Sequence, residues 1–286
     1  PDLQGIMGRY YAQLDGEPTE VCEALDEQYL PRFAGDKLPQ TKTGQALSLA
    51  EKLDTLIGLF GIGQPPTGVK DPFALRRAAL GTLRIVIENQ LDLDLKMLLE
   101  RALKGIGGIA TKQDCVEDVL QYLFERLRGY ASEQGYQNDV FEAVLATQSS
   151  KPVDFMQRLA AVAGFRQLEQ AEALAAANKR IGNILRKNAS AESALAINDD
   201  LLTEDSEQAL AKKVALVKTD IAPLLVKADY AGVLTQLAEM RDTVDAFFDQ
   251  VMVMADDVAV RQNRLALLNQ TRALFLEVAD ISLLQA

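Results

Sequence analysis

The sequence predicts an all-α protein, because of its apolar spacing, its lack of strand patterns and its composition. Apolar residues recur at helical intervals, as they do from residue 46 to residue 60. No sustained alternation of period two indicates a strand. Of the 286 residues, 48% are apolar and 25% are charged, which is typical of a folded globular protein. This length is sufficient for two helical domains.

Clusters of proline, glycine and serine predict where the helices end. Breaks are expected at residues 31, 61–72, 105–108, 135 and 149–152. The last break is expected to separate two domains, residues 1–149 and residues 150–286. In the second domain, residues 188–206 form a polar stretch that is expected to link two helices. Three helical segments are expected after it: Glu207–Leu225, Tyr230–Met254 and Val258–Leu284.

The helix after the glycine-rich loop 61–70 has a predicted start and a polar stripe. Asp71 is expected to be its N-cap, with Pro72 at the first helical position. Arg76 projects toward the apolar side, so we expect it to pair with an internal carboxylate. Arg77 and Arg84 lie on a narrow polar stripe that either contacts a phosphate backbone or is simply solvated. The loop has no preceding strand and lacks the Gly-Lys-Ser/Thr sequence that ends a nucleotide-binding loop. Dinucleotide binding and P-loop nucleotide binding are therefore excluded.

Composition excludes several classes of enzyme. The chain has no histidine, so Ser-His and Cys-His nucleophiles and imidazole metal sites cannot form. Cys22 and Cys115 have no partner at metal-ligand spacing, and they are expected to be reduced, partly buried thiols. Most familiar hydrolase chemistry is therefore excluded. No apolar window could span a membrane and no signal peptide is visible, so the chain is expected to be cytoplasmic. Because the sequence starts at Pro1, without an initiator methionine, it is expected to be a fragment of a longer protein.

Charge is distributed unevenly along the chain. The net charge is -11, which opposes binding to a polyanion, yet residues 151–187 carry seven basic side chains and three acidic ones. Within residues 172–187, apolar side chains occupy one arc of a helix, and Asn178 at its edge is expected to make a structural hydrogen bond. The opposite face carries Lys179, Arg180, Asn183, Arg186 and Lys187. Such a face is either solvated or binds nucleic acid.

Eight short segments of the chain share one resemblance. In the first half these are residues 4–11 (QGIMGRYY), 31–36 (PRFAGD), 60–66 (FGIGQPP) and 70–81 (KDPFALRRAALG). In the second half they are residues 175–181 (AAANKRI), 183–185 (NIL), 245–254 (DAFFDQVMVM) and 263–265 (NRL). These segments resemble the β subunit of the heterotetrameric glycyl-tRNA synthetase, and the resemblance extends over essentially the whole chain.

The resemblance implies an HD-like helical domain, truncated at its start, followed by a helical-bundle anticodon-binding domain of the DALR type. HD hydrolases hold metal with histidine and aspartate, whereas this sequence offers Gln28 and the pair Glu51-Lys52. The domain is therefore expected to be degenerate, and the resemblance implies no catalytic residue, no metal and no cofactor in this chain. The implied function is the tRNA-binding part of glycine–tRNA ligase, an ATP-dependent ligase whose adenylate-forming site, with its ATP and magnesium, belongs to the α subunit of an α2β2 assembly. A phosphohydrolase remnant and a passive assembly scaffold are the alternatives.

The resemblance also gives candidate contacts with glycine tRNA. Glycine anticodons end in two cytosines, whose edges need an acceptor beside donors. Arg180 and Asn183 are candidate donors. The candidate acceptor is a backbone carbonyl or a carboxylate such as Asp154 or Glu169. Phosphate contacts are expected from other basic side chains. These are Lys179, Arg186, Lys187 and Arg166 in the second domain and, more weakly, Lys70, Arg77 and Arg84 in the first.

Overall fold

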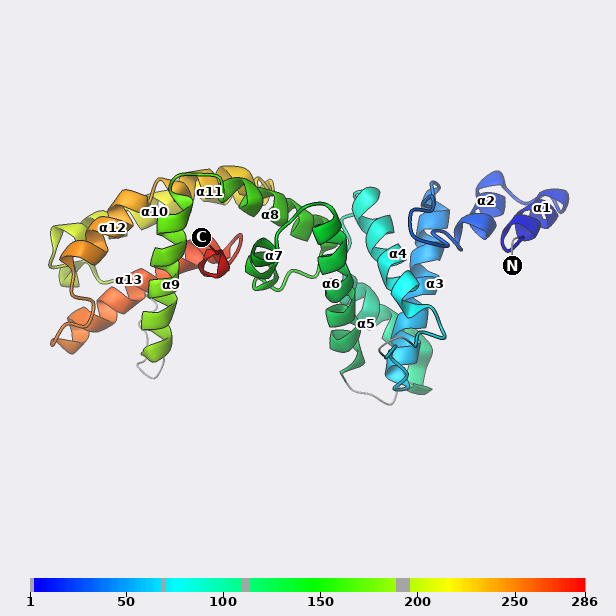
Figure 1. Cartoon of the computed structure of the whole chain (residues 1–286), viewed down its shortest axis with the longest axis horizontal. Helices are drawn as coiled ribbons and strands as arrows, with labels where there is room; N and C mark the ends of the chain where they lie inside the picture. The colour runs from blue at the N-terminus through cyan, green and yellow to red at the C-terminus, as the bar shows by residue number, and fades with distance from the viewer. Residues whose placement is uncertain (1–2, 68–69, 110–113, 189–195, 286) are drawn as a thin grey trace. The chain divides into compact units, whose positions relative to one another are not determined.

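The computed structural model describes residues 3–67, 70–109, 114–188 and 196–285 (Figure 1). Within these ranges the regular elements are thirteen α-helices and three short 3-10 helices, so the predicted all-α class is confirmed. Thr67 and Lys70 form an isolated antiparallel bridge. The chain divides into two compact units, one of residues 1–134 with 150–153 and one of residues 135–149 with 154–286.

Unit 1 is built around α3, a long helix that packs against several others. Thr41 caps its start, because the threonine hydroxyl accepts from the Gly44 amide at 2.9 Å. Leu56 and Ile57 of α3 are fully buried with Leu83 of α4. The helices of unit 1 are α1 (Ile6–Leu14), α2 (Thr19–Glu27), α3 (Lys42–Gly61), α4 (Leu75–Glu88), α5 (Leu95–Ile106) and α6 (Cys115–Glu133), with the 3-10 helix η1 (Gly107–Ile109).

Helix α4 begins later than the sequence predicts. Pro72 lies in a turn that precedes the helix, and the first helical residue is Leu75. Asp71 still satisfies the helix start, because its carboxylate accepts from the amides of Leu75 at 2.8 Å and Arg76 at 3.0 Å. Ala74, which has a positive φ of 55°, closes the intervening turn. The predicted capping residue is correct and the predicted helical position of Pro72 is wrong.

Unit 2 contains the remaining helices. They are α7 (Asn138–Leu145), α8 (Pro152–Phe165), α9 (Ala171–Lys187), α10 (Asp205–Val226), α11 (Tyr230–Ala238), α12 (Arg241–Gln250) and α13 (Val258–Leu276), with η2 (Asp199–Leu201) and η3 (Ile281–Leu283). The first two residues of α8 group with unit 1. Helix α9 packs against α12, α13 and η3, which makes it the scaffold for much of the unit.

Two of the predicted helical segments in unit 2 are interrupted. The segment Tyr230–Met254 consists of α11 and α12, separated at residues 239–240, and the chain leaves α12 after Gln250. Met240 is fully buried at the break, so the apolar period continues across it and hides the turn. In the last segment, the helix ends at Leu276. Four residues later, the Asp280 amide donates to the Ala143 carbonyl at 2.8 Å and no longer to a carbonyl of its own helix. That contact also explains why α7 groups with unit 2, whereas the sequence predicted a boundary after residue 149.

Cys22 and Cys115 are free thiols, as expected from their isolation in the sequence. Both are fully buried, whereas partial burial was expected. Within the described residues, no helix is both long and apolar enough to cross a membrane. Phe247, Val251 and Val253 are buried, so much of the 247–254 segment packs in the core, while Met252 is 76% exposed.

Candidate nucleic-acid interface

The predicted two-sided character of α9 is confirmed. Leu174 and Ile181 are buried on the packed side. Asn178 is also buried, and its side-chain amide donates to the Leu174 carbonyl at 3.0 Å, the structural role expected of it. The polar side chains on the opposite side are all exposed; we call them the open face: Lys179, Arg180, Asn183, Arg186 and Lys187.

The open face keeps its positive charge. Among the described residues, no carboxylate lies within 4.0 Å of the four cationic groups. Arg186 donates to the Asn183 side-chain oxygen at 2.7 Å, which leaves the Asn183 amide group as a donor. Both basic residues of the last turn, Arg186 and Lys187, also lie at the negative end of the helix dipole. A surface of this kind can hold phosphate oxygens without first breaking internal ion pairs.

The open face is bordered by two clefts. Lys179 lines a cleft of about 660 Å³ against η3, which Arg166 also lines. Arg180 lines a second cleft, of about 400 Å³, against α12. The guanidinium carbon of Arg180 lies 4.2 Å from the centroid of the Phe248 ring. Lys179 and Arg180 therefore line two different clefts. Arg186 and Lys187 lie in the last turn of α9.

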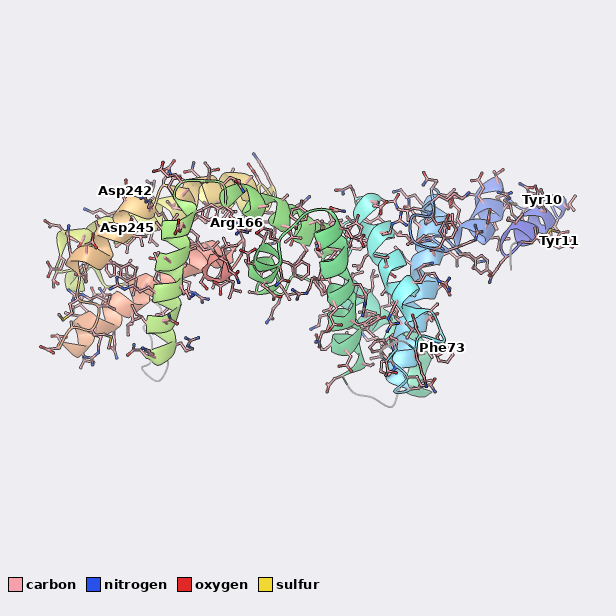
Figure 2. The ribbon with its side chains drawn as sticks, in the orientation of Figure 1. Tyr10, Tyr11, Phe73, Arg166, Asp242 and Asp245 are labelled. Carbon is pink, nitrogen blue, oxygen red and sulfur yellow. The ribbon has the colours of Figure 1, made fainter. Side chains whose placement is uncertain are left out.

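Arg166 differs from the open face, although it belongs to the same basic stretch (Figure 2). Its guanidinium donates to the side chains of Gln137 and Asp139 and to the Gln285 carbonyl. The Asp139 carboxylate is 7% exposed, so this ion pair is largely inside the fold. Arg166 therefore fastens the end of the chain to α7, and its contact with tRNA stays a prediction.

Arg158 is fixed in a similar way. It donates to the Asp154 carboxylate at 2.8 Å and to the carbonyls of Glu277 and Val278. Its guanidinium also stacks on the Tyr230 ring, 4.3 Å from the centroid. Arg158 of α8 and Arg166, which directly follows α8, thus both have internal partners.

Asp154 is unsuited to be the acceptor that the sequence suggested. Its oxygens already accept from Ser149, Arg158 and the Tyr230 hydroxyl. Burial raises its pKa, but these hydrogen bonds outweigh burial and hold the pKa below the usual range. Burial, then Asp154, raises the pKa of Tyr230 to about 12. Glu169 is 88% exposed and so remains accessible, 3.9 Å from Arg241.

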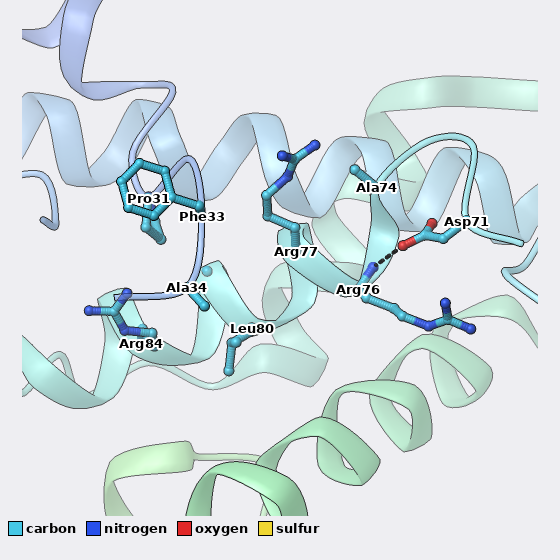
Figure 3. A pocket seen from close by; sticks show the side chains of 10 residues that line it. Pro31, Phe33, Ala34, Asp71, Ala74, Arg76, Arg77, Leu80 and Arg84 are labelled. Carbon is cyan, nitrogen blue, oxygen red and sulfur yellow. Dashed lines mark hydrogen bonds between the residues drawn. The ribbon is translucent and has the colours of Figure 1, made fainter. Parts of the chain in front are cut away.

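The weaker candidates in unit 1 do not form one cationic surface. Arg77 and Arg84 line a cleft of about 430 Å³ beside α4, and Figure 3 shows their guanidinium groups pointing in different directions. Arg84 is paired with Glu88 at 2.7 Å, and Arg77 donates to the Arg32 carbonyl. Lys70 is exposed at the end of the loop. Arg76 is half-buried, and its pairing with an internal carboxylate stays a prediction.

A buried lysine lies beside the residues that the resemblance compares with a metal site. The Lys52 ammonium donates to the Ser48 hydroxyl at 2.8 Å and to the Gln28 carbonyl at 3.3 Å. Burial lowers its pKa, and Glu51 offsets only part of that effect. Within the described residues, no group of three metal-ligating side chains is brought together. A cation of the chain itself thus lies next to Gln28.

Sequence reasoning missed the residues that face Arg180 across the second cleft. They are Asp245, Phe248 and Asp249, all on α12. Their spacing of three and four residues marks one side of a helix, and this signal is visible in the sequence. What the sequence does not show is that this side of α12 lies against α9.

The fold and the open face define a helical protein with a cationic helix surface in its second unit. A model of the family described as "Glycyl-tRNA synthetase beta subunit" matches residues 1–146, and one described as "DALR anticodon binding domain" matches residues 174–282. The chain therefore belongs to the glycyl-tRNA synthetase beta subunit family. The second match includes nearly all of α9 and the whole open face.

Curated relatives agree with the family models. The chain is 52% identical over 283 residues to the glycine–tRNA ligase beta subunit of Marinobacter nauticus, and 52% identical over 285 residues to that of Haemophilus influenzae strain PittGG. It is 51% identical over 284 residues to that of Pseudoalteromonas translucida. Each match covers 99% of this chain and 41% of the relative, so the chain spans about two fifths of the relatives' length.

Proposed function

We propose that this chain is a tRNA-recognising part of a glycine–tRNA ligase, in which unit 2 binds the anticodon arm of glycine tRNA. The observation that carries the proposal is the open face of α9, with four cations that no described carboxylate neutralises. Phosphate binding releases counterions from RNA in proportion to the number of contacts, so such cations supply affinity. The matched family models support the same function.

Recognition of the bases requires a different set of contacts from recognition of the backbone. Loop bases are unstacked, and their Watson–Crick edges are open to side chains. Lys179, Arg186 and Lys187 would hold phosphates and set the register of the loop. Arg180 and Asn183 would donate to base edges. Contacts from Arg77, Arg84 and Lys70 of unit 1 to another part of the tRNA are a weaker element of the proposal.

The chemistry of aminoacylation would take place elsewhere. We assign no catalytic residue to this chain and propose that it acts with the α subunit, whose active site would use ATP and magnesium in an α2β2 assembly. The predicted HD-like character of unit 1 would then be that of a scaffold without hydrolase activity. A passive assembly scaffold, which would bind tRNA negligibly, is the main alternative.

A titration of this chain with glycine tRNA tests the proposal. We expect binding that weakens steeply as the salt concentration rises, and a smaller salt slope for Arg180→Glu and for Lys187→Glu. An anticodon-mutated glycine tRNA should bind more weakly than the cognate one. Unchanged affinity of both variants would contradict the assignment of the open face.

A further inference from the structure

We infer that the cleft between α9 and α12 is a pocket for one cytosine of the anticodon, and that Asp245 is the residue that recognises it. The inference rests on the proposed function and goes one step further, because it names a base and its acceptor. The cleft has a volume of about 400 Å³. Its polar side chains are Arg180 on one wall and Asp245 and Asp249 on the other.

The guanidinium of Arg180 contacts an aromatic ring but has no carboxylate partner among the described residues. It lies on the Phe248 ring at 4.2 Å, a cation–π contact that fixes the plane of the group. Among the described residues, no carboxylate is within ion-pair distance of it, although Asp245 and Asp249 line the same cleft. Arg180 therefore lines the cleft with its guanidinium against the Phe248 ring and, within the part of the chain that the structure describes, with no carboxylate partner.

Asp245 supplies the complementary acceptor. Its side chain is 48% exposed and is labelled on α12 in Figure 2. The guanidinium of Arg241, one turn earlier, lies 3.7 Å from the carboxylate, which is too far for a hydrogen bond. Asp249 is the more exposed of the two aspartates at the rim. Asp245 is thus the better placed of the two to accept from a base inside the cleft.

The arrangement matches the edge of cytosine more closely than the edges of the other bases. Cytosine presents one amino donor beside two acceptors, which pair with one carboxylate and one guanidinium. Uracil replaces the amino donor by a carbonyl oxygen, which would face the Asp245 carboxylate without a proton between them. Guanine offers two donors and one acceptor, so it would leave guanidinium donors unpaired.

The charges on the two walls also separate the base from its backbone. The open face of α9 attracts phosphates, whereas α12 carries Asp242, Asp245 and Asp249 and repels them. A nucleotide at this border would keep its phosphate on α9 and turn its base toward α12. The negative charge of α12 opposes binding of the RNA backbone, but its Asp245 carboxylate can accept a hydrogen bond from the amino group of a base.

The test compares cytosine with uracil at each of the last two positions of the glycine anticodon, which are both cytosine in glycine tRNA. It uses this chain and its Asp245→Asn variant. We expect the unmodified chain to bind the uracil-substituted glycine tRNA roughly 5- to 150-fold more weakly at one of these positions. Because an asparagine amide can donate to the uracil carbonyl, Asp245→Asn should abolish or invert that preference. Its salt slope should equal that of the unmodified chain.

Asp249→Asn is the matched control, because it removes the same charge from the same cleft. It should keep the preference for cytosine. Loss of the preference in Asp249→Asn alone, or its persistence in Asp245→Asn, would overturn the assignment of Asp245 while leaving salt-dependent tRNA binding intact. Equal binding of the cytosine and uracil tRNAs by the unmodified chain at both positions would overturn the cytosine pocket itself, and no tRNA binding at all would overturn the proposed function together with it.

Discussion

Arg158 of α8 and Arg166, which directly follows α8, come from the same stretch of sequence as the cations of α9 but have different roles. Arg158 and Arg166 donate to carbonyls and carboxylates of unit 2, as Arg264 of α13 does with Glu207. We call these three residues the anchored arginines. The cations of the open face have no carboxylate partner among the described residues. The sequence therefore shows how many basic side chains a segment has. Only the packing of the fold determines which of them are free of internal carboxylates and able to bind a ligand.

The largest expected effect concerns the most buried of the anchored arginines. Arg264 donates to Glu207, whose carboxylate is fully buried, and to the Met252 carbonyl at 2.7 Å. Glu207→Gln would leave the guanidinium without its charge partner, at a cost of about 3–5 kcal/mol in unfolding free energy. Urea unfolding followed by circular dichroism measures this cost. Glu172→Gln, at an exposed position of α9, should change stability by less than about 0.5 kcal/mol.

The second expected effect separates Arg166 from its neighbour Lys179, which lines the same cleft. Arg166→Gln breaks the contacts with Asp139 and Gln285, and we expect a loss of about 1–2 kcal/mol in stability with little change in the salt slope of tRNA binding. Lys179→Gln should do the reverse. A large drop in the salt slope for Arg166→Gln, with stability preserved, would show that Arg166 belongs with the open face.

A smaller effect concerns pH and the cluster around Arg158. The pKa of Tyr230 is raised to about 12, so the stability it contributes is complete below its ordinary pKa and is lost as pH rises through about 12. The pKa of Asp154 is lowered, so its contribution is present above the ordinary carboxyl range and is lost as pH falls.

Tyr230→Phe removes the hydroxyl that joins the two groups. We expect a loss of about 1 kcal/mol at neutral pH and a flatter decline of stability at alkaline pH. Unfolding free energies measured across the pH range would show this. An unchanged alkaline decline in Tyr230→Phe would mean that other groups cause it.

The sequence was sufficient to predict the helical class and the two sides of α9, because both depend on spacing within one helix. The partners of Arg166 could not be predicted, since Asp139 and Gln285 are distant along the chain. The cleft beside Phe248 was missed for the same reason, as it requires α12 to lie against α9. Asp154 looked like a free acceptor because its bond with Tyr230 spans 76 residues.

The salt dependence of tRNA binding tests the central claim most directly. Arg186→Gln combined with Lys187→Gln removes two cations from the open face and should lower the salt slope for glycine tRNA by about 2, or about 1 for each phosphate contact. Arg166→Gln should leave the slope near that of the unmodified chain. Equal slopes for all three proteins, or a lower slope only in Arg166→Gln, would contradict the account.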